Sequence, residues 1–119
     1  MSGRTRKVES QLREIVGDEV ATLSDPRIKG LVTVTAVRVS ADLAQATVFY
    51  SVLSAGSPDD AREGLQSAAG RIQAAVAAQT HLRRTPRLRF EPDPVVERAT
   101  KIDSVLREVR QGDDGPDGG

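Results

Sequence analysis

Apolar residues recur at spacings of three and four between residues 5 and 23, which is the period of a helix with one buried face. These positions are Val8, Leu12, Ile15, Val16, Val20 and Leu23. The segment SDPRIKG at 24–30 follows, with Asp before Pro and a closing Gly, residues that favour turns. The pattern therefore predicts a first helix over 5–23 that ends in a loop.

The next two segments have the composition of β-strands. Residues 31–40 (LVTVTAVRVS) and 45–53 (QATVFYSVL) are rich in β-branched residues, and the short segment ADLA connects them. This arrangement predicts an antiparallel hairpin. Phe49 and Tyr50 are neighbours and must point to opposite faces of the sheet. We expect Phe49, like Phe90 further along, to lie in the core.

A second helical pattern follows a run of turn-forming residues at 54–60. Ser57 suits the N-cap and Pro58 the first helical position. The apolar positions continue on one side as far as Leu82, before Pro86 ends the pattern. Gly70 interrupts it, and Gly costs roughly 1 kcal/mol relative to Ala in a helix interior. We therefore expect a bend or a close backbone approach at the interhelical kink formed by Ala68, Ala69 and Gly70.

The order of the elements predicts the fold class. Residues 87–91 (RLRFE) alternate polar and apolar and predict a short third strand, and apolar positions between 95 and 109 predict a last helix. The resulting α-β-β-α-α-β order predicts an α+β domain with a three-stranded sheet and helices packed on one side. It resembles a type II KH domain in element order, although AAG replaces the GxxG loop with which KH domains hold nucleic acid.

The charges of this chain are unevenly distributed, although 17 basic residues balance 17 acidic ones. Residues 1–13 carry four basic residues and one acid, and residues 71–90 carry five arginines and no acid. The last nine residues carry three acids and no base. Arg pairs with phosphates and stacks on unpaired bases, so this distribution favours an RNA-binding surface on a basic domain with an acidic tail.

Several classes of chemistry are not expected. The chain has no Cys, which removes disulfides, thiolate metal sites and cysteine nucleophiles. Its one His, His81, is expected at a helix end, and Asp59–Asp60 and Asp113–Asp114 are expected to cap or solvate the chain. No run approaches the roughly 18 apolar residues of a membrane span. We expect a soluble cytoplasmic protein with no metal, no cofactor, no small-molecule substrate and no membrane partner.

Four segments resemble the ribosome-binding factor A family of bacterial small-subunit assembly factors. They are SDPRIKG, VTVTAVRVSADLAQATVFYSVL, SAAGRI and LRRTPRLRFEPD, and the resemblance covers about residues 5–110. Their order and spacing make the match specific. The resemblance implies a monomeric KH-like protein that is not an enzyme. It would bind the free immature 30S subunit and 16S rRNA, assist late maturation including 5′-end processing, and support growth in the cold.

The residue pattern and the family resemblance together predict the domain limits and the RNA-binding residues. We expect a flexible basic end at 1–4, a KH-like domain at 5–110 and a disordered acidic tail at 111–119. The proposed RNA-binding residues are Arg4, Arg6, Lys7, Arg27, Lys29, Gly70, Arg71, Arg83, Arg84, Arg87 and Arg89. Each arginine could instead be merely solvated. The alternative function is a KH-like protein-interaction or ligand-sensing module, whose binding would respond little to salt.

Overall fold

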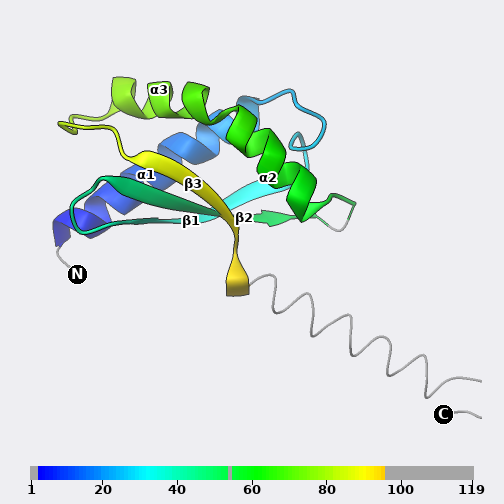
Figure 1. Cartoon of the computed structure of the whole chain (residues 1–119), viewed down its shortest axis with the longest axis horizontal. Helices are drawn as coiled ribbons and strands as arrows, with labels where there is room; N and C mark the ends of the chain where they lie inside the picture. Colours follow the sequence, from blue (N-terminus) through cyan, green and yellow to red (C-terminus); the bar gives the residue numbers. More distant parts are fainter. Residues whose placement is uncertain (1–2, 54, 96–119) are drawn as a thin grey trace, which may run out of the picture.

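The computed structural model describes residues 3–53 and 55–95. Three strands form one layer, and three helices cover one face of it (Figure 1). The elements in chain order are α1 (Gly3–Thr22), β1 (Val32–Val39), β2 (Gln45–Val52), α2 (Pro58–Ser67), α3 (Ala69–Gln79) and β3 (Arg87–Pro92). The predicted α+β class and element order are confirmed. The helix expected beyond Val95 and the acidic tail lie outside the described residues.

The sheet has the strand order β1-β2-β3. β1 and β2 pair antiparallel from Val32 opposite Val52 to Val39 opposite Ala46, with a bulge between Val34 and Ala36. This confirms the predicted hairpin. β3 pairs parallel with β2, because the α2–α3 crossover returns the chain to the end of the sheet where β2 began.

The two faces of the sheet differ sharply in polarity. Val48, Tyr50 and Phe90 point toward the helices and are at most 1% exposed. Phe49 points the other way and is half-buried, so the expectation that Phe49 lies in the core is wrong. Side chains alternate between the two faces along β2, so Ala46, Val48 and Tyr50 all point toward the helices. Tyr50 can enter the core because its hydroxyl donates to the Pro58 carbonyl at 3.1 Å.

Helix α1 buries the face that its apolar spacing predicts. All six apolar positions named for the first helix are buried, Leu12 and Val16 completely. α1 begins at Gly3, two residues before the predicted start. Arg4 therefore lies within α1, although the sequence placed it in the flexible basic end at 1–4, and Arg6 and Lys7 lie in the helix as its predicted range implies.

The α2–α3 pair begins as expected, because the Ser57 hydroxyl accepts from the Asp60 N–H at 3.3 Å and Pro58 opens the helix. Ala68 separates the two helices, which meet at an angle in Figure 1. Gly70 lies within α3, and a Cβ added to it would meet no atom within 4 Å. Of the two expected alternatives, a bend or a close backbone approach, the close approach is therefore absent at Gly70. It occurs at Gly64, where an added Cβ would lie 2.9 Å from Ile28 Cδ1.

Helix α3 ends earlier than its apolar spacing suggested. Thr80 is extended, with φ −123° and ψ 161°, and its hydroxyl donates to the Val76 carbonyl at 2.8 Å. This side-chain bond satisfies a terminal carbonyl of α3, and the extended backbone of Thr80 ends the helix. Leu82 still packs against the core, but from the connecting loop.

Candidate nucleic-acid interface

The outer face of the sheet, which α1, α2 and α3 leave uncovered, carries arginines from two strands. Leu88 and Phe90 face the core, so Arg87 and Arg89 of β3 point outward. The pairing register places Arg38 of β1, Thr47 of β2 and Arg89 of β3 in one row across the sheet. Because side chains alternate along a strand, Arg87 and Arg89 lie on the same face of the sheet and contribute to a basic surface there.

Arg83 and Arg84 extend this surface beyond the start of β3. Both are exposed, and with the hairpin turn at 42–44 and Leu82 they line a depression of about 640 Å³. The Ser40 hydroxyl and the Ala44 N–H, together with the charge of Arg84, hold the pKa of Asp42 below its usual value. We call Arg83, Arg84, Arg87 and Arg89 the β3 arginine surface.

The members of the β3 arginine surface differ in whether a carboxylate neutralises their charge. Arg89 Nε lies 3.1 Å from Glu91 Oε1, and the same carboxylate binds Arg62 of α2 at 3.0 Å. Among the described residues, Arg83, Arg84 and Arg87 form no direct ion pair. These three guanidinium groups can engage an anion without breaking an internal ion pair.

Arg71 and Gly70 lie apart from this surface, on α3. Arg71 donates to the Thr22 hydroxyl at 3.1 Å and lies 3.6 Å from Glu19, both on α1. The five arginines of residues 71–90 therefore do not form one cluster. Arg71 links the end of α1 to the start of α3.

Arg27 is engaged within the loop after α1. Its side chain grips both carboxylate oxygens of Asp25, with Nη2 2.7 Å from Oδ2 and Nε 3.0 Å from Oδ1, and its N–H donates to the same carboxylate. These contacts hold the pKa of Asp25 below its ordinary value. Lys29 is exposed nearby. Arg27 thus has a structural role, and an RNA contact would have to compete with Asp25.

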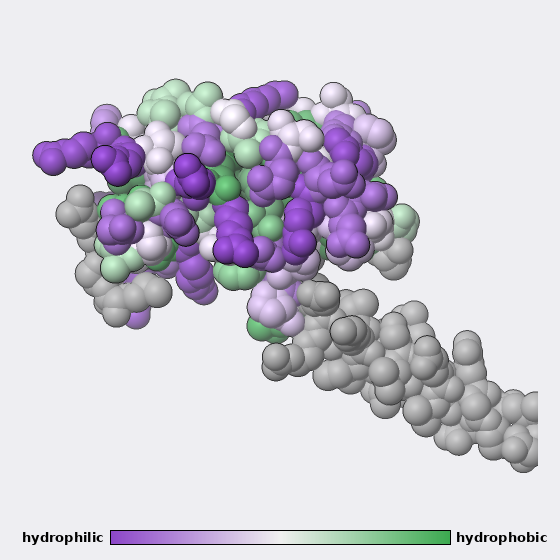
Figure 2. Space-filling model, viewed as in Figure 1, coloured by the Kyte–Doolittle hydropathy of each residue, from purple (hydrophilic) through white to green (hydrophobic). Residues whose placement is uncertain are grey.

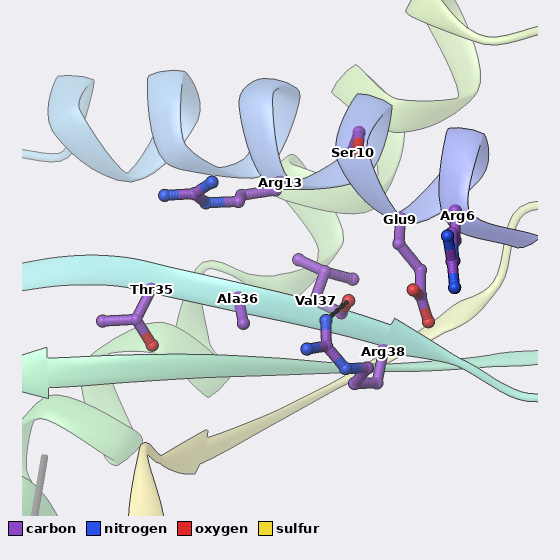
Figure 3. A pocket seen from close by; sticks show the side chains of 8 residues that line it. All are labelled: Arg6, Glu9, Ser10, Arg13, Thr35, Ala36, Val37 and Arg38. Carbon is purple, nitrogen blue, oxygen red and sulfur yellow. Dashed lines mark hydrogen bonds between the residues drawn. The ribbon is translucent and has the colours of Figure 1, made fainter. Parts of the chain in front are cut away.

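The basic residues of α1 lie beside an arginine of β1, an arrangement that the sequence did not reveal. Arg6 and Arg13 lie seven residues apart, so they share one side of α1, and with Arg38 they line a groove along β1 (Figure 3). Arg13 and Arg38 were not among the predicted RNA-binding residues. The i, i+7 spacing was readable, but the approach of Arg38 depends on how α1 packs on β1. Arg4 lies within α1, and Lys7 is exposed.

Residues 3–53 and 55–95 offer no alternative chemical centre. They contain no group of three or more His, Asp or Glu side chains placed to hold a metal ion. Their buried side-chain polar atoms all have hydrogen-bond partners. None of their helices is long and apolar enough to cross a membrane. His81 is an exposed residue of the loop after α3. The arginine surfaces are the chemically distinctive feature of this part of the chain.

The α-β-β-α-α-β order, the interruption at Ala68 and the parallel third strand define a KH-like α+β domain. Residues 4–106 match the family model described as Ribosome-binding factor A. The chain belongs to the ribosome-binding factor A family. This confirms the family resemblance that the four sequence segments suggested.

Individual relatives agree with this assignment. Ribosome-binding factor A of Rubrobacter xylanophilus is 72% identical over 116 residues, which cover 98% of this chain and 94% of the relative. The crystal structure of ribosome-binding factor A from Thermus thermophilus has a TM-score of 0.69 and 35% identity, over 74% of this chain and 93% of that chain. A homology model of the Thermus thermophilus factor, fitted into a cryo-EM map of its 30S complex, has a TM-score of 0.62 and 36% identity, over 71% and 90% of the two chains.

Proposed function

We propose that this protein binds the small ribosomal subunit through 16S rRNA and assists the late maturation of that RNA, including its 5′ end. The observation that carries the proposal is family membership across residues 4–106, together with the similar protein fitted into a 30S complex. The proposed binding unit is the domain at 5–110, acting as a monomer in the cytoplasm, with the acidic tail at 111–119 dispensable.

The β3 arginine surface is the proposed contact with rRNA. Arg83, Arg84 and Arg87 are exposed and carry fixed positive charge without a direct ion pair among the described residues. A guanidinium group can bind phosphate oxygens in pairs and can stack on an unpaired base. Such contacts are sequence-tolerant, which suits a folded rRNA surface where loops and grooves alternate.

No reaction is needed for this role. A protein that binds one arrangement of an RNA more tightly than another shifts the RNA toward the first, by no more than the difference in binding free energy. Release follows when the favoured contacts are lost in the mature particle. The protein is therefore proposed as a binding factor and not as an enzyme.

The alternative, a protein-interaction or ligand-sensing module, would be expected to expose an acidic or an apolar patch. Hydrophilic side chains cover most of the visible face in Figure 2. Within the described ranges the only large apolar side chains that are exposed are Leu53 and Val95, and they do not belong to the same element. Scattered apolar residues of this kind are ordinary for a monomer surface. The described surface thus favours a charged partner.

Co-sedimentation tests the proposal. The full chain is centrifuged with immature small subunits, with mature small subunits and with 70S ribosomes. We expect binding to free small subunits, strongest for the immature form, and none to 70S ribosomes. Cells that lack the protein should also accumulate 16S rRNA with an unprocessed 5′ end, measured by primer extension. Protein that stays in the supernatant with all three particles would contradict the proposal.

A further inference from the structure

A second basic surface lies at the sheet edge opposite β3. Strand order β1-β2-β3 leaves β1 at this edge, and α1 packs along it. The two elements enclose an open groove of about 650 Å³, which we call the α1–β1 groove (Figure 3). Its lining residues are Arg6, Glu9, Ser10 and Arg13 from α1, and Thr35, Ala36, Val37 and Arg38 from β1.

Three arginine side chains line the α1–β1 groove. Arg6 and Arg13 are two helical turns apart, about 10 Å along the axis at 1.5 Å per residue. Arg38 comes from β1, and its Nη1 donates to the Val37 carbonyl at 3.0 Å. All three residues are exposed, and none of them forms an ion pair with any residue in the described ranges. Other arginines of this domain, such as Arg27 and Arg62, have carboxylate partners.

One carboxylate lies in the α1–β1 groove, and it has a separate structural task. Glu9 is only 8% exposed, and its Oε2 accepts from the Val39 N–H at 2.9 Å. This bond satisfies a backbone donor at the end of the edge strand β1. Glu9 offsets one of the three positive charges, so the groove retains a net positive charge. Clefts lined by one sign of charge concentrate counter-ions of the opposite sign.

We propose that the α1–β1 groove binds the backbone of a single-stranded RNA segment. Its arginines come from two elements, and Arg6 and Arg13 lie two helical turns apart, so successive phosphates of a strand match them better than one small anion does. The exposed Ser10 hydroxyl lies between Arg6 and Arg13 in sequence and can bond a phosphate or a 2′-hydroxyl. Edge exposure of β1 would also suit an acidic peptide. The row of Arg38, Thr47 and Arg89, which runs from the groove across the outer face of the sheet, favours RNA.

The α1–β1 groove connects to the proposed rRNA contact across the outer face of the sheet. Arg38 lines the groove and also begins the row that passes through Thr47 to Arg89 of the β3 arginine surface. The inference rests on the proposed function in one respect, namely that the strand belongs to rRNA. Two basic surfaces at opposite sheet edges allow one protein to hold two RNA segments in a fixed relative arrangement. Linking two contacts in this way raises the affinity beyond that of either alone.

Binding of an oligouridylate strand tests the groove without the ribosome. The test variant combines Arg6→Gln, Arg13→Gln and Arg38→Gln, and the matched control is Arg62→Gln, an exposed arginine on α2. Each phosphate contact adds about 0.7 to the slope of log affinity against log salt for a single strand. We expect weaker binding by the test variant, with a slope smaller by about 2, and an unchanged slope for the control. Thermal melting establishes that both variants are folded.

A charge-raising variant provides the opposite readout. Glu9→Gln keeps an oxygen that accepts from the Val39 N–H but removes the negative charge from the groove. Oligouridylate should bind this variant more tightly than the wild type. A merely structural role of the groove would give no such gain, so unchanged affinity in both Glu9→Gln and the triple variant would overturn the inference.

Three further outcomes are decisive. If oligoglutamate of equal charge binds as tightly as oligouridylate and depends on the same three arginines, the groove is a site for acidic peptides and the inference is wrong. If the wild type binds oligouridylate through the groove but does not bind small subunits, the proposed function fails while the RNA site remains. If small subunits bind wild type and triple variant equally, the groove does not contact rRNA and the inference is overturned.

Discussion

Gly64 lies where α2 meets the loop after α1, and a larger side chain there would force Ile28 to shift. An added Cβ would lie 2.9 Å from Ile28 Cδ1 and 3.3 Å from the Asp25 carboxylate, and Ile28 is itself 1% exposed. Gly70 has open space around its Cα and a helical environment in α3. The two glycines therefore predict opposite responses to the same substitution.

Gly64→Ala is expected to lower the free energy of unfolding by about 1–3 kcal/mol through overpacking. Gly70→Ala is expected to raise it by about 0.5 kcal/mol, because alanine loses less backbone entropy in a helix. Urea unfolding of both variants and the wild type measures the difference. Destabilisation by Gly70→Ala, with Gly64→Ala tolerated, would contradict the described packing of α2.

Asp25 predicts a pH dependence of stability. The Arg27 side chain and N–H hold the folded-state pKa of Asp25 below its ordinary value of about 3.9. The resulting stabilisation is complete above the unfolded-state pKa and is lost as the pH falls through the lower folded-state pKa. Asp25→Asn should thus have a lower urea midpoint than the wild type at pH 7, and the difference should shrink below about pH 4.

The matched control for this pH dependence is Asp18→Asn, at an exposed position on α1. It should leave the midpoint nearly unchanged at both pH values. A difference between Asp25→Asn and the wild type that stays constant down to pH 2 would show that the Asp25–Arg27 contact is not the source of the effect.

At the scale of elements, both ends of α2 carry a serine, but only one of them caps the helix. The Ser57 hydroxyl accepts from the Asp60 N–H, whereas the Ser67 hydroxyl donates to the Glu63 carbonyl within the helix. Ser57→Ala should cost about 1 kcal/mol of unfolding free energy, the usual value of an N-cap. Ser67→Ala should be neutral or slightly stabilising, since alanine is the better helix former. Equal effects in thermal or urea unfolding would contradict the assigned cap.

Elements fixed by local signals could be predicted from the sequence, and elements fixed by packing could not. The first helix, the hairpin and the Ser57 cap each follow from spacing, composition or a single polar side chain. The end of α3 is set by the extended backbone of Thr80, although the apolar spacing continues to Leu82. The close approach at Gly64 depends on Ile28, which is far away in the sequence. Only the folded chain brings such partners together.

The candidate interface likewise has a part that local signals predict and a part that depends on packing. Arg87 and Arg89 could be predicted as neighbours on one face because strand alternation is local. The sequence wrongly suggested a single cluster with Arg71, since the reversal between α3 and β3 separates them. It also concealed the α1–β1 groove, because Arg38 meets Arg6 and Arg13 only through packing of α1 on β1.

At the scale of the whole molecule, the formal net charge of zero conceals an uneven distribution of basic and acidic residues. The three acids of the last nine residues and the ion-paired carboxylates Asp25, Glu19 and Glu91 are six of the 17 acids that bring the sum to zero. Within the described ranges, Arg83, Arg84 and Arg87 near one edge of the sheet and Arg6, Arg13 and Arg38 at the other edge form no direct ion pair. The spatial arrangement of charge, rather than its total, predicts a polyanionic partner.

The central claim is that this charge arrangement binds the small subunit through rRNA. The most direct test is the equilibrium affinity for free small subunits at increasing salt, for the wild type, a variant with Arg83→Gln, Arg84→Gln and Arg87→Gln, and the Arg62→Gln control. The account predicts a steep fall of wild-type affinity with salt, a shallower fall and weaker binding for the triple variant, and wild-type behaviour for the control. Binding that hardly changes with salt, and that the triple variant retains in full, would contradict the account and favour a protein-interaction module.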